Sequence, residues 1–336
     1  MNPQPSVAEP VSAARRLRFA TLAFPPAGLW LLWRGPATLG RKLLGTLGVG
    51  LFSLLYAAAI FFLLHQFAGL RFEMQGRPIP IPTWQVTDYE RLEKARAATG
   101  GAFTAKAPAP AQKKSSPPHW TNFRGPKRDG HYTEQLINVD WVKSPPKRLW
   151  QQPVGGGYAS FVVADGLAFT IEQRREQEVV TAYEVATGRE VWAHGYAARF
   201  HEWMGGEGPR ATPTWHDGRL YSLGGTGQFR CLEAATGRLL WQHDLFTENG
   251  CTNLYFGMGA SPLIVDDKVL VLAGEPQGRD GRMLIAYDKV SGSLVWKTLE
   301  DKAAYSSPML VTLAGERQLL VHSAGHLLGV SPADGR

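Results

Sequence analysis

A motif that recurs along the second half of the chain constrains the fold more than any other feature. Each copy has a small residue, an acidic residue two positions later, a Thr/Ser-Gly pair and a Trp four positions after the glycine: AYEVATGREVW from Ala182, CLEAATGRLLW from Cys231 and AYDKVSGSLVW from Ala286. A fourth copy begins at Gly329 and reaches Arg336. The motif glycines are 49, 55 and 43 residues apart, and a period of about 40–50 residues is typical of propeller blades. The residues that define the pattern are Gly188, Trp192, Gly237, Trp241, Gly292 and Trp296.

Each repeat predicts four short antiparallel strands joined by glycine-containing turns. In the second repeat the strands are Thr212–Trp215, Arg219–Leu223, Gln228–Glu233 and Arg238–His243. In the third they are Pro262–Val265, Lys268–Leu272, Met283–Tyr287 and Ser293–Thr298. A single four-stranded sheet exposes both faces, so neighbouring sheets must stack to bury them. We therefore predict an all-β fold, a β-propeller of four-stranded antiparallel blades with three full repeats and a partial fourth.

The motif resembles the PQQ-like repeat of quinoprotein-type and BamB-like propellers, over about residues 146–336. In that family the Trp packs between neighbouring blades, so the resemblance implies core positions for the motif tryptophans. The stretch WTNFRGPKRDG, Trp120–Gly130, resembles the segment that precedes such repeats and is called the WxxF segment below.

The two ends of the repeat array suggest how it closes. KRLWQ, from Lys147, looks like the end of a repeat whose start is missing, and the last copy stops before its outer Trp strand. Trp150 could supply that strand after Arg336 and close four blades. Because the resembled family usually has seven or eight blades, we also expect the sequence to be a C-terminally truncated product.

A membrane anchor is predicted at residues 43–64, which read LLGTLGVGLFSLLYAAAIFFLL without a charge. Twenty-two helical residues span about 33 Å, enough for the hydrocarbon core of roughly 30 Å. The alternatives are a buried helix or a cleaved signal peptide, but the run is long for the latter and lacks a clear cleavage site. Residues 22–33 are apolar but shorter, and we expect them at the interface, with a second span as the alternative.

Flanking charges predict the orientation of this anchor. Six basic residues precede it, and Arg71 and Arg77 follow closely. The excess places residues 1–42 in the cytoplasm and the repeats outside it, anchored as a single pass in the inner membrane. Residues 65–118 read as a short solvated helix and a Pro/Ala/Lys-rich linker, and residues 119–336 as the repeat domain.

The positive net charge of +7 is not spread over the chain. Residues 1–118 hold 14 Lys+Arg and 5 Asp+Glu, whereas residues 119–336 hold 22 and 24. The repeat domain is thus nearly neutral, which argues against nucleic acid as a partner.

The longest loops between repeats are the candidate binding site. Residues 199–210 and 247–259 combine charged groups, amides and aromatic rings with permissive glycines, which can form a binding surface on a rigid scaffold. Solvated inter-blade loops are the alternative. The candidate ligand-binding residues are His201, Glu202, Trp203, Arg210, Asn253 and Tyr255.

No catalytic residue or metal site is predicted. Adjacent His201 and Glu202 do not point to one face of a strand, and H-E-x-x-H, C-x-x-C and G-x-S-x-G are all absent from the sequence. Cys231 takes the place of the small motif residue and should be buried. In an oxidising compartment a disulfide with Cys251 is possible, and a free thiol is the alternative.

Two functions follow from the resemblance. The first is a binding or scaffold protein of the cell envelope with a protein partner and no required cofactor, similar to BamB-type propellers, although this chain lacks their N-terminal acylated cysteine. The second is a PQQ-dependent quinoprotein dehydrogenase with calcium. For that activity the family uses an Asp base and a pair of adjacent cysteines, and neither can be matched here.

Overall fold

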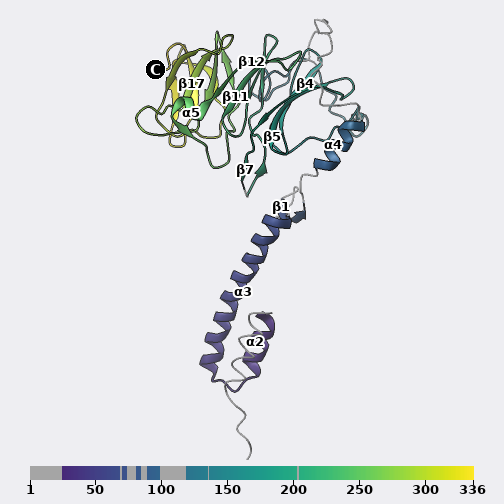
Figure 1. Ribbon diagram of the computed structural model, residues 1–336, viewed down its shortest axis with the longest axis vertical. Coiled ribbons are helices and arrows are strands. Elements are labelled where there is room, and N and C mark those ends of the chain that lie inside the picture. The colour runs from purple at the N-terminus through teal and green to yellow at the C-terminus, as the bar shows by residue number, and fades with distance from the viewer. Residues whose placement is uncertain are drawn as a thin grey trace, which may run out of the picture. The chain divides into compact units, whose positions relative to one another are not determined.

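The computed structural model describes residues 25–68, 70–73, 81–84, 89–98, 119–134, 136–202 and 204–336. Residues 99–118, which contain the predicted linker, lie outside the described residues, and so does Trp203. The chain divides into two compact units, Met1–Val86 and Thr87–Arg336 (Figure 1).

The first unit is built on one long apolar helix. Helix α3, Leu39–Ala68, contains the predicted span and extends it at both ends. Within the described residues it is the one helix long and apolar enough to cross a membrane. Helix α2, Pro25–Arg34, packs beside it, and the Trp33 indole donates to Thr46 Oγ1 over 3.0 Å. At ten residues, or about 15 Å, α2 is too short to span the bilayer.

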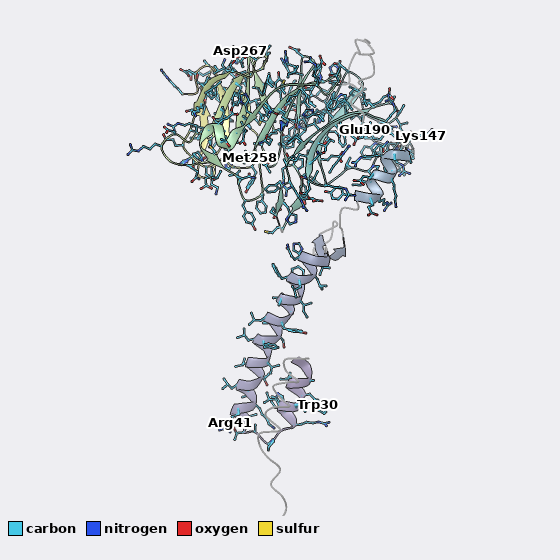
Figure 2. The ribbon with its side chains drawn as sticks, viewed as in Figure 1. Trp30, Arg41, Lys147, Glu190, Met258 and Asp267 are labelled. Atoms are coloured by element: carbon cyan, nitrogen blue, oxygen red, sulfur yellow. The ribbon has the colours of Figure 1, made fainter. Side chains whose placement is uncertain are left out.

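Trp30 and Arg41 lie at the same end of this helix pair (Figure 2). The Arg34 guanidinium lies 4.0 Å from the centre of the exposed Trp30 ring. An exposed indole beside basic side chains is typical of a membrane interface. After α3, strands β1, Leu70–Glu73, and β2, Ile81–Trp84, form an antiparallel hairpin that the sequence did not predict.

The second unit contains three four-stranded antiparallel sheets and one three-stranded sheet. The first comprises β3 Val162–Ala164, β4 Leu167–Arg174, β5 Gln177–Glu184 and β6 Glu190–Ala197. The second comprises β9 Thr214–His216, β10 Arg219–Leu223, β11 Gln228–Glu233 and β12 Leu239–Asp244. The third comprises β14 Leu263–Val265, β15 Lys268–Leu272, β17 Leu284–Asp288 and β18 Leu294–Thr298. The last comprises β19 Met309–Leu313, β20 Glu316–His322 and β21 Leu327–Val330.

The predicted strands of the second and third repeats are confirmed to within two residues. Shorter elements in the loops were not predicted. They are the pair β7 His201–Glu202 and β8 Gly206–Glu207, the pair β13 Cys251–Thr252 and β16 Glu275–Pro276, and helix α5 Leu245–Asn249.

A tryptophan joins each sheet to the next. The Trp192 ring lies against Gly237, Trp241 against Gly292 and Trp296 against Gly335, and a Cβ added at any of these glycines would fall 2.6–2.8 Å from the ring. The Trp192 indole also donates to Ala234 O over 2.9 Å. The sheets therefore follow one another in chain order with buried faces between them (Figure 1).

The closure of four blades predicted for Trp150 is not observed among the described residues. The Trp150 indole donates to Val185 O over 2.7 Å, and its ring covers Gly188 of the first sheet. Trp150 thus fills the first joint of the series, as Trp192 fills the second. Among the described residues, β21 pairs with β20 alone.

The WxxF segment runs along the first strands of three sheets. Trp120 forms a two-way backbone bridge with Val163 of the first sheet, and Thr121 O accepts the Trp215 N–H of the second. Arg128 reaches the third, donating to Pro262 O over 2.7 Å and to Ser261 O over 3.1 Å.

Helix α4, Tyr89–Ala98, corresponds to the helix predicted as solvated, but it packs on the first sheet. Leu92 and Arg96 are buried. Arg96 Nη2 lies 3.0 Å from a carboxylate oxygen of Glu172 on β4, and Glu93 pairs with Arg175 over 2.7 Å at the surface. The partners lie about 80 residues further along the chain, where no local sequence signal could indicate them.

Candidate functional site

The first predicted loop is held by a buried carboxylate. Glu202 lies in the β7–β8 hairpin with its side chain 7% exposed. Its oxygens accept the backbone N–H groups of Met204, at 2.7 Å, and Gly205, at 2.5 Å. Arg210 Nη2 lies 3.3 Å from the same carboxylate, so the negative charge is paired within the loop.

Arg210 joins the two predicted loops. Its Nε donates to Phe256 O of the second loop over 3.0 Å, and its Nη2 donates to Gly206 O of the first over 2.8 Å. The guanidinium carbon lies 4.5 Å from the centre of the Phe200 ring and 5.2 Å from that of Tyr158. Burial lowers the pKa of Arg210, against the opposing effect of Glu202, and the group remains a cation at neutral pH.

Four aromatic residues surround this clamp and face solvent. Tyr158, Tyr255, Phe256 and Tyr305, called the aromatic surface below, are 62%, 57%, 36% and 44% exposed. Tyr255 and Phe256 meet edge to face at 4.9 Å, and Phe256 meets Tyr305 at 5.7 Å. The Phe256 N–H donates to the Tyr305 hydroxyl over 3.1 Å, and the Tyr158 hydroxyl donates to Gly205 O over 2.7 Å. Hydrogen bonds thus hold the Tyr158 and Tyr305 hydroxyls, and all four residues keep a large part of their surface exposed.

The structure brings some of the predicted residues together and separates others. Glu202, Arg210 and Tyr255 belong to the joined loops, whereas His201 is exposed beside Glu202 without a role in the clamp. Asn253 is half-buried and donates to Gly225 O over 2.9 Å, which makes it a loop tether. Tyr158 and Tyr305 were missed because they lie outside both loops and carry no motif of their own.

A buried acid, Glu178, was also missed. It lies on β5 with no exposed surface, and its carboxylate accepts the Tyr196 hydroxyl and the Gly225 N–H, both at 2.8 Å. Burial raises the pKa of Glu178, partly offset by these hydrogen bonds and by nearby Arg230. A glutamate at an inward-facing position of a strand is the signal that could have revealed it. Glu178 therefore ties the turn between β10 and β11, which contains Gly225, to the first sheet.

Both cysteines are free thiols in buried positions, so the possible disulfide is not formed. Cys231 faces Trp241 across the strand pair, in the position that alanine takes in the other repeats. Cys251 donates to Arg282 O over 3.2 Å. Burial raises the pKa of Cys231 to about 11, which makes it an unreactive packing residue at neutral pH.

The loops do not fit PQQ with calcium. The Glu202 oxygens already face three N–H donors, and the two cysteines are separate core residues. Within the described part of the chain, no group of three or more His, Cys, Asp or Glu residues is placed to hold a metal ion.

The Trp–Gly joints between the sheets are the structural counterpart of the repeat motif. The family described as outer membrane protein assembly factor BamB matches residues 175–336, which confirms the resemblance over these residues. No curated protein matches the sequence significantly.

The similar solved structures include a BamB protein and dehydrogenases. BamB from Moraxella catarrhalis is 15% identical with a TM-score of 0.40, covering 56% of this chain and 49% of its own. Quinohemoprotein alcohol dehydrogenase from Comamonas testosteroni is 12% identical with a TM-score of 0.38, covering 74% and 52%. A europium-containing methanol dehydrogenase is 20% identical with a TM-score of 0.32, covering 45% and 26%. This chain thus spans about a quarter to a half of these structures.

Proposed function

We propose that this protein is a membrane-anchored scaffold of the cell envelope that binds a protein partner through its aromatic surface. The observation that carries the proposal is a set of exposed Tyr and Phe rings held around one arginine clamp. Tyr, Phe and Arg are enriched in protein interfaces, where rigid rings bury a large area at little entropic cost. The paired charges beneath the rings are consistent with a binding surface and offer no free nucleophile.

The scaffold in this proposal is a β-propeller whose blades are the four sheets. Two features support it. Each sheet after the first receives the Trp of the preceding sheet, and the first strands β3, β9 and β14 are neighbours along one side of the array. In a propeller, radial stacking of this kind would put the loops before β9 and β14 on one end of the blades, the end that this proposal assigns to the partner.

The anchor in this proposal is residues 43–64, with residues 1–42 in the cytoplasm and the repeats in the periplasm. Helix α3 has the required length and hydropathy, and the basic residues concentrated before it set the direction of insertion.

Site-specific photo-crosslinking in cells tests the binding proposal. A benzoylphenylalanine at Tyr255 should give a defined protein adduct, whereas the same group at Val290, exposed in a turn of the third sheet, should not. Arg210→Met should lower the adduct at least fivefold by releasing the rings. Arg199→Gln, which removes the half-exposed arginine that pairs with Glu176 and Glu207 in the same loop, should leave it unchanged. Equal adducts at Tyr255 and Val290, or none at Tyr255, would refute the proposal.

A further inference from the structure

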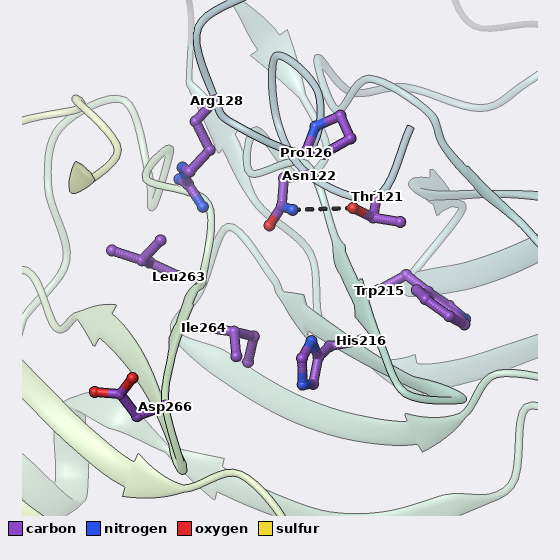
Figure 3. Close-up of a pocket in the computed structure, with 9 residues that line it drawn as sticks. All are labelled: Thr121, Asn122, Pro126, Arg128, Trp215, His216, Leu263, Ile264 and Asp266. Carbon is purple, nitrogen blue, oxygen red and sulfur yellow. Dashed lines mark hydrogen bonds between the residues drawn. The ribbon is translucent and has the colours of Figure 1, made fainter. Parts of the chain in front are cut away.

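A cavity of about 430 Å³ lies beneath the WxxF segment, against the first strands of the second and third sheets. Asn122 and Arg128 contribute to its wall from that segment, Trp215 and His216 from the β9 end, and Leu263 and Ile264 from β14 (Figure 3). A volume of this size accommodates a small organic molecule.

Arg128 brings a buried positive charge to this cavity. It is 5% exposed, and within the described part of the chain its hydrogen-bond partners are the carbonyls of Ser261 and Pro262. Its Nε is buried without a partner. Burial alone lowers the pKa of Arg128 to about 10, so the group is still charged at neutral pH. Two carbonyl dipoles compensate a buried charge less well than an anion does.

The other charged groups around the cavity already have partners. Asp266 is bound by Arg317, with oxygen–nitrogen distances of 3.0 and 3.2 Å. His216 lies between Lys289 Nζ, at 3.0 Å, and an oxygen of Asp217, at 3.1 Å. The uncompensated charge in the cavity is therefore that of Arg128.

The remaining lining combines hydrogen-bonding groups with an apolar wall. The Asn122 amide nitrogen is engaged by Thr121 Oγ1 over 3.1 Å, and its oxygen points toward the cavity (Figure 3). The Trp215 ring points away from Asn122 and Ile264 (Figure 3). Leu263 and Ile264 supply the apolar part of the lining, so a ligand with one acidic end and an apolar body would meet Arg128 with the first and these side chains with the second.

We propose that this cavity binds a small organic carboxylate, with its charged end at the Arg128 guanidinium and its apolar body against Leu263 and Ile264. The site is separate from the aromatic surface. Met258, of the second loop, and Asp267, next to the cavity residue Asp266, lie at opposite ends of the third sheet (Figure 2). The inference therefore does not depend on the proposed partner.

Isothermal titration calorimetry of the full chain in detergent micelles tests the site, with N-acetyl-L-leucine as the probe and N-acetyl-L-leucinamide as its neutral counterpart. The acid should bind at least tenfold more tightly than the amide, since a charge-assisted hydrogen bond contributes about 1.5–3 kcal/mol. The proposal would be overturned if about 10 mM acid, the weak limit for a ligand this small, gave no heat of binding. It would also be overturned if acid and amide bound equally well.

Two variants separate binding from folding. Arg128→Gln removes the charge, and Ile264→Phe fills the cavity without altering the guanidinium; each should weaken binding of the acid at least tenfold. Arg238→Gln, an exposed arginine in a turn outside the cavity, should have no effect. Thermal unfolding identifies a variant that fails to fold, and unchanged binding in a folded Ile264→Phe chain would refute the site.

The peptide Ac-Ala-Ala-Ala-Leu, with a free C-terminus, distinguishes the two sources of such a carboxylate. Binding tighter than that of N-acetyl-L-leucine would support a protein chain end as the ligand, and weaker binding would support a free small acid.

Discussion

At the residue scale, the repeat motif is explained position by position. The small residue faces the Trp across the strand pair, as Ala182 faces Trp192, and the register shifts immediately after it. The acid two positions later accepts the hydroxyl of the Thr or Ser before the glycine, as Glu184 accepts Thr187 over 2.6 Å. The glycine closes the turn and leaves room for the Trp of the preceding sheet.

Gly237→Ala tests this joint. Gly237 has a φ of 72° and would place a Cβ 2.6 Å from the Trp192 ring, so both backbone strain and a clash oppose alanine. Gly218→Ala is the matched control, because Gly218 has a φ of 71° and an open surrounding. We expect a loss of about 1 kcal/mol in the free energy of unfolding for the control, and about 2–4 kcal/mol for Gly237→Ala once an overpacking cost of about 1–3 kcal/mol is added. Urea unfolding followed by tryptophan fluorescence measures both, and equal losses would contradict the contact.

The raised pKa of Glu178 predicts a pH dependence of stability. A folded-state pKa above the ordinary value of 4.5 means that the folded chain holds this proton more tightly than the unfolded chain. The resulting stabilisation is complete below pH 4.5 and is lost as the pH rises through the folded-state pKa.

Glu178→Gln has no carboxyl group to titrate at this position, so the variant does not lose this stabilisation. Its free energy of unfolding should therefore increase relative to that of the wild type as the pH rises from about 4.5. Thermal unfolding across pH 4–8 checks the trend. Glu176→Gln, at the surface, shows whether loss of any negative charge has the same effect. A constant difference between Glu178→Gln and wild type across this range would contradict the assignment.

At the element scale, the strands whose positions depend on local sequence patterns could be predicted. Turn glycines and alternating apolar residues located the strands of the second and third sheets within two residues. Contacts between distant segments could not be predicted, since Arg96 meets Glu172 and Arg128 meets Pro262 across 76 and 134 residues. The same holds for the site. Its two loops were located, but Tyr158 and Tyr305 join them only through tertiary packing.

Arg96→Met tests the attachment of α4. The substitution keeps an apolar stem but removes one cation from a buried carboxylate, so we expect a loss of about 3 kcal/mol and release of the helix. Hydrogen exchange of residues 89–98 should rise markedly in this variant. Glu93→Gln removes the exposed pair with Arg175 and should cost less than about 1 kcal/mol. Equal exchange in the two variants would show that the buried pair does not hold the helix.

At the scale of the whole molecule, we expect the apolar helix α3 to lie in the lipid bilayer and the repeat array to lie in water. Alkaline carbonate washing should leave the protein in the membrane pellet. Two arginines in place of Leu51 and Leu55 should move it toward the supernatant, because each costs about 2.5–3.5 kcal/mol within a helix at the bilayer centre. Leu313→Arg, at an exposed strand end of the last sheet, should stay in the pellet. Release of the wild-type chain would refute the anchor.

The orientation has its own test. A reporter that is active only after export, fused after Arg336, should be active, since the basic residues precede α3. Activity of a cytoplasm-dependent reporter at the same position would reverse the orientation.

The Trp–Gly joint has a consequence for how such proteins change over time. Each of the three four-stranded sheets presents its motif glycine on one side and its motif indole on the other, so the array is directional, and each contact involves two neighbouring sheets alone. The Trp–Gly contact does not determine how many repeats precede or follow it. Duplication or loss of one whole repeat would therefore preserve every remaining joint, whereas an insertion within a repeat would break two. We expect relatives to differ by entire sheets more readily than by parts of one.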